Sequence, residues 1–196
     1  MNKKAAEALI KADVLKFGAF TLANGTVSPV YVDVRVLPSS PESFKIISKL
    51  LAKEAKKLGV DIVAGAETAG IPLAASMSVL SGLPMVYVRK HPKSHGTNSQ
   101  IEGLLPEGKK VVLVDDMMTD GGSKLVFIEG LRNAKAVVQD VLIVLDREQG
   151  GSKTLESAGC RLHALITLKQ LLKYMRKSNL IDETKYEEVL EYLKRK

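Results

Sequence analysis

The chain has little of the chemistry that disulfide scaffolds and nucleic-acid stacking surfaces need. It is 196 residues long, with one cysteine, no tryptophan and an aromatic content of 5%. One cysteine forms neither an intramolecular disulfide nor a cysteine-based metal cluster, which favours a reducing compartment, and we expect the cytoplasm. Because aromatic rings are few, a broad stacking surface is not evident, and we expect no specific nucleic-acid partner.

Segments suited to secretion or membrane insertion are also absent from the sequence. Behind a basic start, charges at Glu7, Lys11 and Asp13 interrupt the apolar run that a signal peptide needs. Residues 68–88 carry no charge, but prolines and serines break this segment, which predicts a buried helix, a turn and a buried strand. We therefore expect no membrane partner.

The remaining composition suits one globular domain with a basic surface. Hydrophobic residues make up 45% of the chain, charged residues 26%, and the net charge is +7. This length supports one sizeable core, so we expect a single domain over residues 1–196. The positive charge suits anionic ligands and would also give weak, nonspecific binding to nucleic acid.

The most informative stretch covers residues 111–123. Its apolar start, Val111–Val114, predicts a buried strand that ends at two adjacent carboxylates, Asp115 and Asp116. A loop of small residues follows, and helical spacing resumes at Lys124. Such a loop presents backbone N–H groups and the positive end of a helix dipole to a phosphate. The loop residues are Thr119, Asp120, Gly121, Gly122 and Ser123.

The acidic pair indicates a ligand that is more than a phosphate. Two carboxylates would repel a bare phosphate, but they suit a sugar phosphate with free hydroxyls, or a bound divalent cation. Asp115 and Asp116 could instead merely cap the turn and the helix after it. Two carboxylates in tandem before Thr-Asp-Gly-Gly-Ser favour the functional interpretation.

This stretch resembles the diphosphosugar-binding signature of type I phosphoribosyltransferases. By that resemblance, Asp115 and Asp116 contact the ribose hydroxyls of 5-phosphoribosyl-1-diphosphate (PRPP), and residues 119–123 hold its 5-phosphate. The resemblance implies an α/β fold, and the alternation of strands and helices independently predicts a doubly wound, mainly parallel sheet. Two other phosphate motifs, G-x-x-x-x-G-K-[ST] and G-x-G-x-x-G, do not occur in the chain.

A second resemblance lies in residues 20–31. The Asn24-Gly25 pair between β-prone runs predicts a hairpin, which could be a simple edge hairpin. The run Phe-Thr-Leu-x-x-Gly-x-x-Ser-Pro-x-Tyr resembles the hood that covers the pyrimidine in orotate phosphoribosyltransferases, which implies that Tyr31 binds substrate. Apolar spacing over residues 4–17 predicts a preceding helix, so a helix and a small N-terminal hood occupy residues 1–36.

A polar, basic loop occupies residues 89–103. Such a charged run is usually a solvated surface loop, although long polar loops in compact domains are more often functional. The pattern Arg-Lys-x-x-Lys-x-His-Gly resembles the mobile catalytic loop of orotate phosphoribosyltransferases, which reaches the diphosphate in the neighbouring subunit. The resemblance implies a homodimer in which Lys90, Lys93 and His95 are catalytic and Arg89 binds substrate.

Arg147 follows a strand predicted over residues 136–145. An arginine at the carboxyl end of such a strand points into the ligand crevice, and its planar fork suits a carboxylate. An ion pair with Asp146 or Glu148 is the alternative. The run Leu-Asp-Arg-x-x-Gly-Gly resembles the orotate-family motif whose arginine receives the orotate carboxylate, which implies that Arg147 sets base specificity.

Two positions depart from the family pattern. The small-residue loop at 66–70 resembles the diphosphate loop of the type I family, although a tight strand–helix turn would have the same composition. Some orotate phosphoribosyltransferases carry a lysine where Ala69 stands in this loop, and many carry one where Ala23 stands in the hood. Two positive charges are therefore missing here.

Together the resemblances imply an enzyme that transfers the 5-phosphoribosyl group from PRPP to orotate in pyrimidine biosynthesis. We expect Mg²⁺ on the diphosphate and no all-protein metal cage, and Asp116 is a further catalytic candidate that could move a proton. Two alternatives stay open: transfer to a purine or another base, and a noncatalytic regulator that senses the diphosphosugar and binds nucleic acid. The intact basic loop argues against the regulator.

Overall fold

A central sheet organises the fold, and the structure, a computed structural model, describes residues 1–21, 25–92 and 99–194. Its strands are β3 (Ile62–Ala66), β4 (Met85–Val88), β5 (Ile101–Glu102), β6 (Lys110–Met118), β7 (Val137–Asp146) and β8 (Arg161–Thr167). Within the described residues they pair in the order β5-β4-β3-β6-β7-β8, and every neighbouring pair except β4 and β5 is parallel. The predicted mainly parallel α/β sheet is confirmed.

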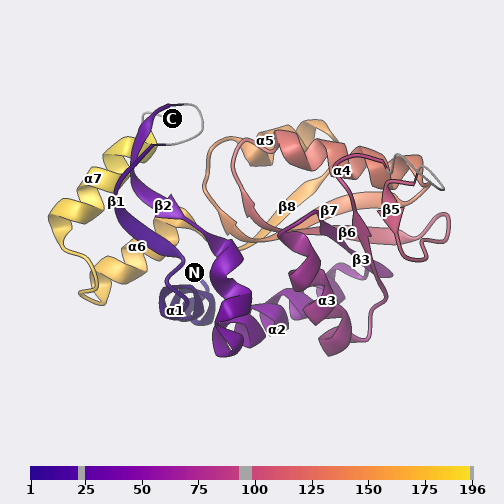
Figure 1. The fold of residues 1–196 in the computed structure, drawn as a ribbon, viewed down its shortest axis with the longest axis horizontal. Coiled ribbons are helices and arrows are strands. Elements are labelled where there is room, and N and C mark those ends of the chain that lie inside the picture. The colour runs from indigo at the N-terminus through magenta and orange to yellow at the C-terminus, as the bar shows by residue number, and fades with distance from the viewer. Residues whose placement is uncertain (22–24, 93–98, 195–196) are drawn as a thin grey trace.

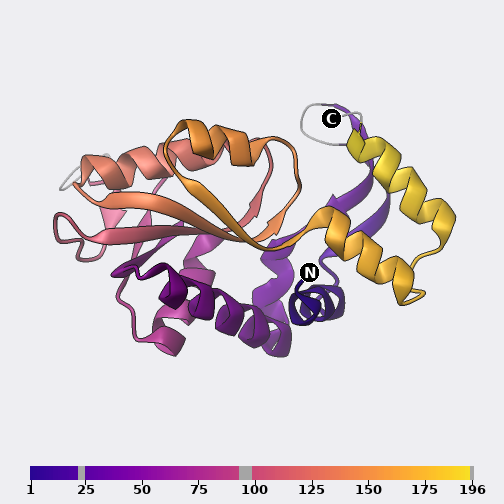
Figure 2. The same ribbon diagram turned by 180° about the vertical axis from the view of Figure 1, so that it is seen from behind.

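Helices cover both faces of the sheet (Figures 1 and 2). One face carries α2 (Pro41–Leu58) and α3 (Gly70–Ser81), and the other carries α4 (Gly122–Asn133) and α5 (Gly151–Ser157). Side chains of β6 divide between two apolar cores: Val112 and Val114 join the first, Val111 and Leu113 the second. Because both faces are buried, this strand is an unbroken apolar run in the sequence.

A hairpin and the two ends of the chain form a lobe beside the sheet (Figure 1). It contains α1 (Lys3–Lys11), β1 (Leu15–Thr21), β2 (Val27–Val32), the 3₁₀ helix η1 (Val34–Ser39), α6 (Leu168–Lys177) and α7 (Glu183–Lys194). β1 and β2 pair antiparallel, as the sequence predicts for the hood, and α7 packs against β2. Across the described ranges, no helix combines the length and apolar character that crossing a membrane requires.

The first helix is shorter than the sequence pattern predicts. The apolar spacing over residues 4–17 predicts one helix, and that prediction is wrong beyond Lys11. There α1 ends, Asp13 takes a left-handed φ of 55°, and β1 begins at Leu15. Leu15 and Phe17 both pack on the core from a strand, where alternate residues share a face, so their spacing imitates a helix.

Candidate active site

The sheet reverses its winding between β3 and β6, and the candidate site lies at this reversal. From β3 the chain continues through α3 to β4 on one side, and from β6 it continues through α4 to β7 on the other. Ligands bind beyond the carboxyl ends of strands at such a point. A Cβ on Gly70 would lie 2.2 Å from the Val114 carbonyl oxygen, so only glycine lets α3 start this close to β6.

A hollow of about 230 Å³ opens beside these strand ends, between η1 and the start of α3. Arg35, Thr68 and Asp116 supply its polar lining. The apolar lining consists of Val34, Leu37, Pro38, Ala69, Pro72 and Leu73. A largely apolar hollow with a few converging polar groups is typical of a small-molecule site, and one member of the predicted acidic pair faces it.

The two carboxylates of the acidic pair have different surroundings. Asp115 is 5% exposed, its carboxylate is ion-paired with the Lys124 ammonium, and its Oδ1 accepts the Asp116 N–H at 2.9 Å. Asp116 lines the hollow, and its Oδ1 accepts the Met117 N–H at 2.7 Å. Burial, and then repulsion by Asp115, raises the pKa of Asp116 to about 6. Asp116 therefore exchanges a proton close to neutral pH.

The predicted phosphate loop, Thr119–Ser123, forms the turn between β6 and α4. α4 begins at Gly122 without a side-chain cap on its N-cap residue Gly121, whose carbonyl accepts the Lys124 N–H at 3.0 Å. Within the loop, the Gly122 N–H donates to Asp120 Oδ1 at 3.1 Å. The Gly151 N–H donates to the Thr119 carbonyl at 3.0 Å, so the start of α5 supports the loop. This geometry suits an anion.

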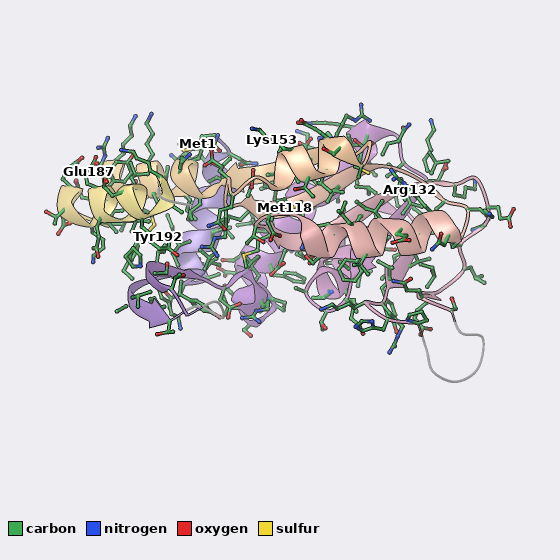
Figure 3. All side chains as sticks on the ribbon, turned by 90° about the horizontal axis from the view of Figure 1, so that it is seen from above. Met1, Met118, Arg132, Lys153, Glu187 and Tyr192 are labelled. Carbon is green, nitrogen blue, oxygen red and sulfur yellow. The ribbon has the colours of Figure 1, made fainter. Side chains whose placement is uncertain are left out.

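Arg147 lies one strand away from the acidic pair, directly after β7. Its backbone N–H donates to the Met118 carbonyl at 3.0 Å, and Figure 3 shows Met118 at the end of the sheet that faces Tyr192 of α7. Arg147 Nε is buried and has no hydrogen-bond partner in the described chain, where no ion pair joins Arg147 to Asp146 or Glu148. Burial lowers the pKa of Arg147, and the electrostatic effect of Tyr192 opposes this shift.

The basic loop is anchored at its base. The Arg89 N–H donates to the Gln100 carbonyl at 2.9 Å, and Gln100 Nε2 donates back to the Arg89 carbonyl at 2.8 Å. The Lys90 N–H donates to Glu67 Oε2 at 2.8 Å, which ties the loop to the small-residue turn before α3. Arg89 Nη1 also lies 3.8 Å from Glu102 Oε1. The two predicted diphosphate segments are therefore joined at their bases.

Some residues singled out from the sequence lie outside the described residues, and one, Ala69, lacks the positive charge that some family members have there. Lys93 and His95 of the basic loop, and Ala23 of the hood, lie outside the described residues. Ala69 lines the hollow at the start of α3 and offers no positive charge there. Among the residues that line the hollow, Arg35 is the one cation.

The predicted hood residue Tyr31 connects to the hollow through Arg35. Its ring lies 5.5 Å from that of Phe20, centroid to centroid, and its hydroxyl accepts a hydrogen bond from Arg35 Nη2 at 3.1 Å. Asp33 orients the same guanidinium, with Oδ1 2.7 Å from Arg35 Nε and Oδ2 3.1 Å from Nη2. The hood thus positions a cation at the site.

Three residues of the site were not predicted from the sequence: Arg35, Lys124 and Tyr192. Arg35 lies four positions after Tyr31, so its place beside the hood motif is a signal that could have found it. Lys124 follows the phosphate loop directly, but its burial against Asp115 depends on the tertiary structure. Tyr192 lies in the last helix, where its spacing resembles that of any amphipathic helix.

Comparisons with known proteins agree with this geometry. The family model for the phosphoribosyl transferase domain matches residues 35–158. The orotate phosphoribosyltransferase of Saccharolobus solfataricus is 38% identical over 96% of this chain and 95% of its own length. The crystal structure of the Aeropyrum pernix orotate phosphoribosyltransferase has a TM-score of 0.79 at 37% identity, covering 87% of this chain and 97% of that one.

Two further structures extend the comparison. UMP synthase of Leishmania donovani has a TM-score of 0.87 at 32% identity and covers 98% of this chain, which spans 42% of that longer protein. The Mycobacterium tuberculosis orotate phosphoribosyltransferase in complex with PRPP has a TM-score of 0.72 at 25% identity, covering 86% of this chain and 98% of that one.

The fold, the crevice at the strand ends and the family match define the protein as a phosphoribosyltransferase. Among the members of that class, similarity over nearly the whole chain is to those that act on orotate. The chain belongs to the orotate phosphoribosyltransferase family.

Proposed function

We propose that this protein transfers the 5-phosphoribosyl group of PRPP to N1 of orotate, giving orotidine 5-phosphate and diphosphate for pyrimidine biosynthesis. The observation that carries the proposal is the buried Arg147 Nε, which has no partner in the described chain. A guanidinium binds a carboxylate through two parallel hydrogen bonds, and orotate is a pyrimidine that carries one. The names of the relatives and the PRPP-bound structure support both substrates.

The sugar phosphate is held at the end of β6. Residues 119–123 bind the 5-phosphate through backbone N–H groups at the start of α4, with Thr119 and Ser123 as further donors. Asp116 accepts hydrogen bonds from the ribose hydroxyls, and Asp115 contributes its charge from the core behind it. Negative charge beside the sugar stabilises the positive charge that develops at the anomeric carbon.

The leaving diphosphate lies between the turn before α3 and the basic loop. Arg89, Lys90, Lys93 and His95 stabilise the negative charge that grows as the C–O bond breaks. Such a displacement needs no covalent nucleophile, so the protein contributes by holding orotate and PRPP in line. Closure of the loop excludes water from the reactive sugar.

Mg²⁺ bound with PRPP would take most of its ligands from diphosphate oxygens and water, the arrangement that this ion prefers. There it would neutralise charge on the leaving group. The described residues contain no group of three or more His, Cys, Asp or Glu side chains that could hold a metal ion.

The enzyme acts in the cytoplasm as a homodimer of single-domain subunits. Support for the homodimer comes from the resemblance of residues 89–103 to the catalytic loop that, in orotate phosphoribosyltransferases, serves the neighbouring subunit's site. The single cysteine is consistent with a reducing compartment.

Diphosphate release with a panel of bases tests the proposed function. Purified protein, PRPP and Mg²⁺ are incubated with orotate, uracil, hypoxanthine or guanine, and released diphosphate is measured. Among the four bases, we expect only orotate to cause diphosphate release, because the other three lack the carboxylate that Arg147 binds. Release with hypoxanthine or guanine, and none with orotate, would instead establish a purine phosphoribosyltransferase.

A further inference from the structure

Arg35 is an exposed arginine beside the site, and the proposed function gives it no role. It lies in the first turn of η1, and its side chain is 61% exposed. Among the described residues that line the hollow, it is the one cation. Thr68 and Ala69 line the same hollow from the turn before α3, where the proposed function places the leaving diphosphate. Arg35 therefore lies where an anionic part of the substrate is expected.

Two neighbours orient the Arg35 guanidinium. Asp33 Oδ1 accepts from Nε at 2.7 Å, and Asp33 Oδ2 accepts from Nη2 at 3.1 Å. The Tyr31 hydroxyl also accepts from Nη2, at 3.1 Å. A guanidinium carries five N–H donors, of which Nη1 has two. Within residues 1–21, 25–92 and 99–194, Nη1 has no hydrogen-bond partner, so an oriented pair of donors is left for a ligand.

The charges around the hollow favour an anion at these donors. Arg35 and Asp116 are its charged lining residues, and no ion pair joins them in the described chain. Asp33, the partner of Arg35, does not line the hollow, and Ala69 brings no charge to it. A diphosphate close to the Asp116 carboxylate needs a cation beside it, because unpaired like charges repel.

We propose that Arg35 binds the diphosphate of PRPP through Nη1 and supplies there the positive charge that Ala69 does not. Hydrogen bonds from a guanidinium to phosphate oxygens are charge-assisted and about twice as strong as neutral ones. Because Asp33 and Tyr31 already orient the guanidinium, little side-chain entropy is lost when the ligand binds. The hood thereby contributes to holding the sugar substrate as well as the base.

This inference rests on the proposed function, because it assigns PRPP to the hollow. Two other roles for Arg35 make different predictions. If Arg35 contacted the base instead, its loss would leave PRPP affinity unchanged when no base is present. If Arg35 only supported the hood, its loss would weaken every ligand of the site alike, whether or not the ligand carries a diphosphate.

The experiment uses calorimetry, with Mg²⁺ and without a base, to compare PRPP with ribose 5-phosphate, which has the same sugar and 5-phosphate but no diphosphate. The proteins are the wild type, Arg35→Gln, the double variant Arg35→Gln/Ala69→Lys and the control Arg161→Gln. Arg161 is likewise exposed and held by an aspartate, since its Nε and Nη2 donate to Asp140 at 2.9 Å each. It begins β8, at the opposite end of the parallel strands from the hollow.

We expect Arg35→Gln to bind PRPP about tenfold more weakly than the wild type, because charge-assisted hydrogen bonds to the diphosphate are lost. Its affinity for ribose 5-phosphate should stay within about twofold of the wild type. The double variant should bind PRPP several-fold more tightly than Arg35→Gln, because its lysine returns a positive charge to the turn before α3. Arg161→Gln should match the wild type for both ligands.

Wild-type affinity for PRPP in Arg35→Gln would overturn the proposal, and so would an equal loss of affinity for both ligands. A double variant that binds PRPP no more tightly than Arg35→Gln would overturn the claim that Arg35 supplies a charge that Ala69 does not. If circular dichroism shows that Arg35→Gln does not fold, Asp33→Asn/Arg35→Gln, which leaves no unpaired carboxylate at Asp33, replaces it with the same expectation. Wild-type protein that binds PRPP but does not use orotate would defeat the proposed base without affecting this test.

Discussion

Arg147 is the residue on which the assignment of the base depends. Its backbone is fixed by the hydrogen bond to Met118, while its buried Nε has no partner in the described chain. A buried donor without a partner costs free energy unless a ligand supplies the acceptor. The proposed recognition of orotate therefore depends on one side chain, which follows the strand next to β6.

Replacing Arg147 should impair the use of orotate without impairing PRPP binding. We expect Arg147→Ala to lower kcat/KM for orotate about 100-fold or more, because two charge-assisted hydrogen bonds are lost. PRPP affinity, measured by calorimetry, should stay within about threefold of the wild type, because Arg147 belongs to neither the acidic pair nor the phosphate loop. Orotate turnover at the wild-type rate in this variant would contradict the assigned role.

The ionised form of Asp116, which suits the ribose hydroxyls, should lower the free energy of unfolding. Its pKa in the folded protein, about 6, lies above the ordinary value of 3.8, so the protonated form favours folding and the carboxylate opposes it. This cost develops between about pH 4 and pH 6 and is present in full above that range. We expect Asp116→Asn to raise the free energy of unfolding by about 1–3 kcal/mol at pH 8, less any screening by solvent at the hollow.

Urea unfolding of the wild type and Asp116→Asn at two pH values provides the measurement. The difference between the two proteins should shrink as the pH falls from 6 to 4 and vanish at about pH 3, where Asp116 is protonated in both the folded and the unfolded state. A variant that is less stable than the wild type at pH 8 would contradict the cost of burying this carboxylate.

At the scale of residues, the sequence predicted which residues belong to the candidate site better than it predicted their burial and contacts. The predicted strand continues past Asp115 and Asp116 to Met118, Asp116 lines the hollow, and Arg147 directly follows β7. Nothing in the spacing shows that Asp115 is buried against Lys124 while Asp116 is left at the hollow. That difference depends on the packing of α4 against β6, which one-dimensional patterns do not contain.

At the scale of elements, the site depends on how closely α3 approaches β6. Gly70 allows the approach, because a Cβ there would lie 2.2 Å from the Val114 carbonyl oxygen. By contrast, a Cβ on Gly122, at the start of α4, would meet its nearest neighbour, Asp120 Oδ1, at 3.7 Å. Two glycines at helix starts in one site therefore have different tolerance for a methyl group.

Alanine substitutions at Gly70 and Gly122 should differ in their effect on stability, because only Gly70 is closely packed against a neighbouring strand. We expect Gly70→Ala to lower the free energy of unfolding by about 2–3 kcal/mol, because the added methyl group forces α3 away from β6. Gly122→Ala should change it by less than about 1 kcal/mol, because alanine favours a helical position and meets no close contact. Thermal unfolding measures both, and equal stability of the two variants would contradict the geometry.

Strands and helices with strong periodicity were predicted well, and connections between lobes were not. The hairpin at β1–β2 and the strand–loop–helix unit of β6 and α4 are confirmed. The first helix was predicted too long, because the alternating residues of β1 continued its apolar spacing. The packing of α7 on β2, which brings Tyr192 toward Arg147, joins segments far apart in sequence and has no local signal.

At the scale of the whole molecule, the proposed homodimer makes a prediction about mixed subunits. Asp116→Asn removes the sugar contact of its own subunit, and Lys93→Ala removes a loop charge that serves the partner. Each variant alone should be nearly inactive. After the two are mixed and allowed to exchange subunits, activity should return to about one quarter of the wild type, because half of the dimers are mixed and each has one intact site.

The same mixture provides the control. If each loop served its own subunit, both sites of the mixed dimer would be defective. One site would lack Asp116 and the other would lack Lys93, so no activity would return. Sedimentation velocity of the wild type measures the oligomeric state independently, and a monomer at assay concentration would contradict the homodimer.

The most direct test of the central claim follows the ultraviolet absorbance of orotate with purified wild-type protein, PRPP and Mg²⁺. We expect the orotate signal to fall only when protein and PRPP are both present, and diphosphate to appear in equal amount. An unchanged orotate signal, while the protein binds PRPP or releases diphosphate with another base, would contradict the assignment of orotate as the acceptor.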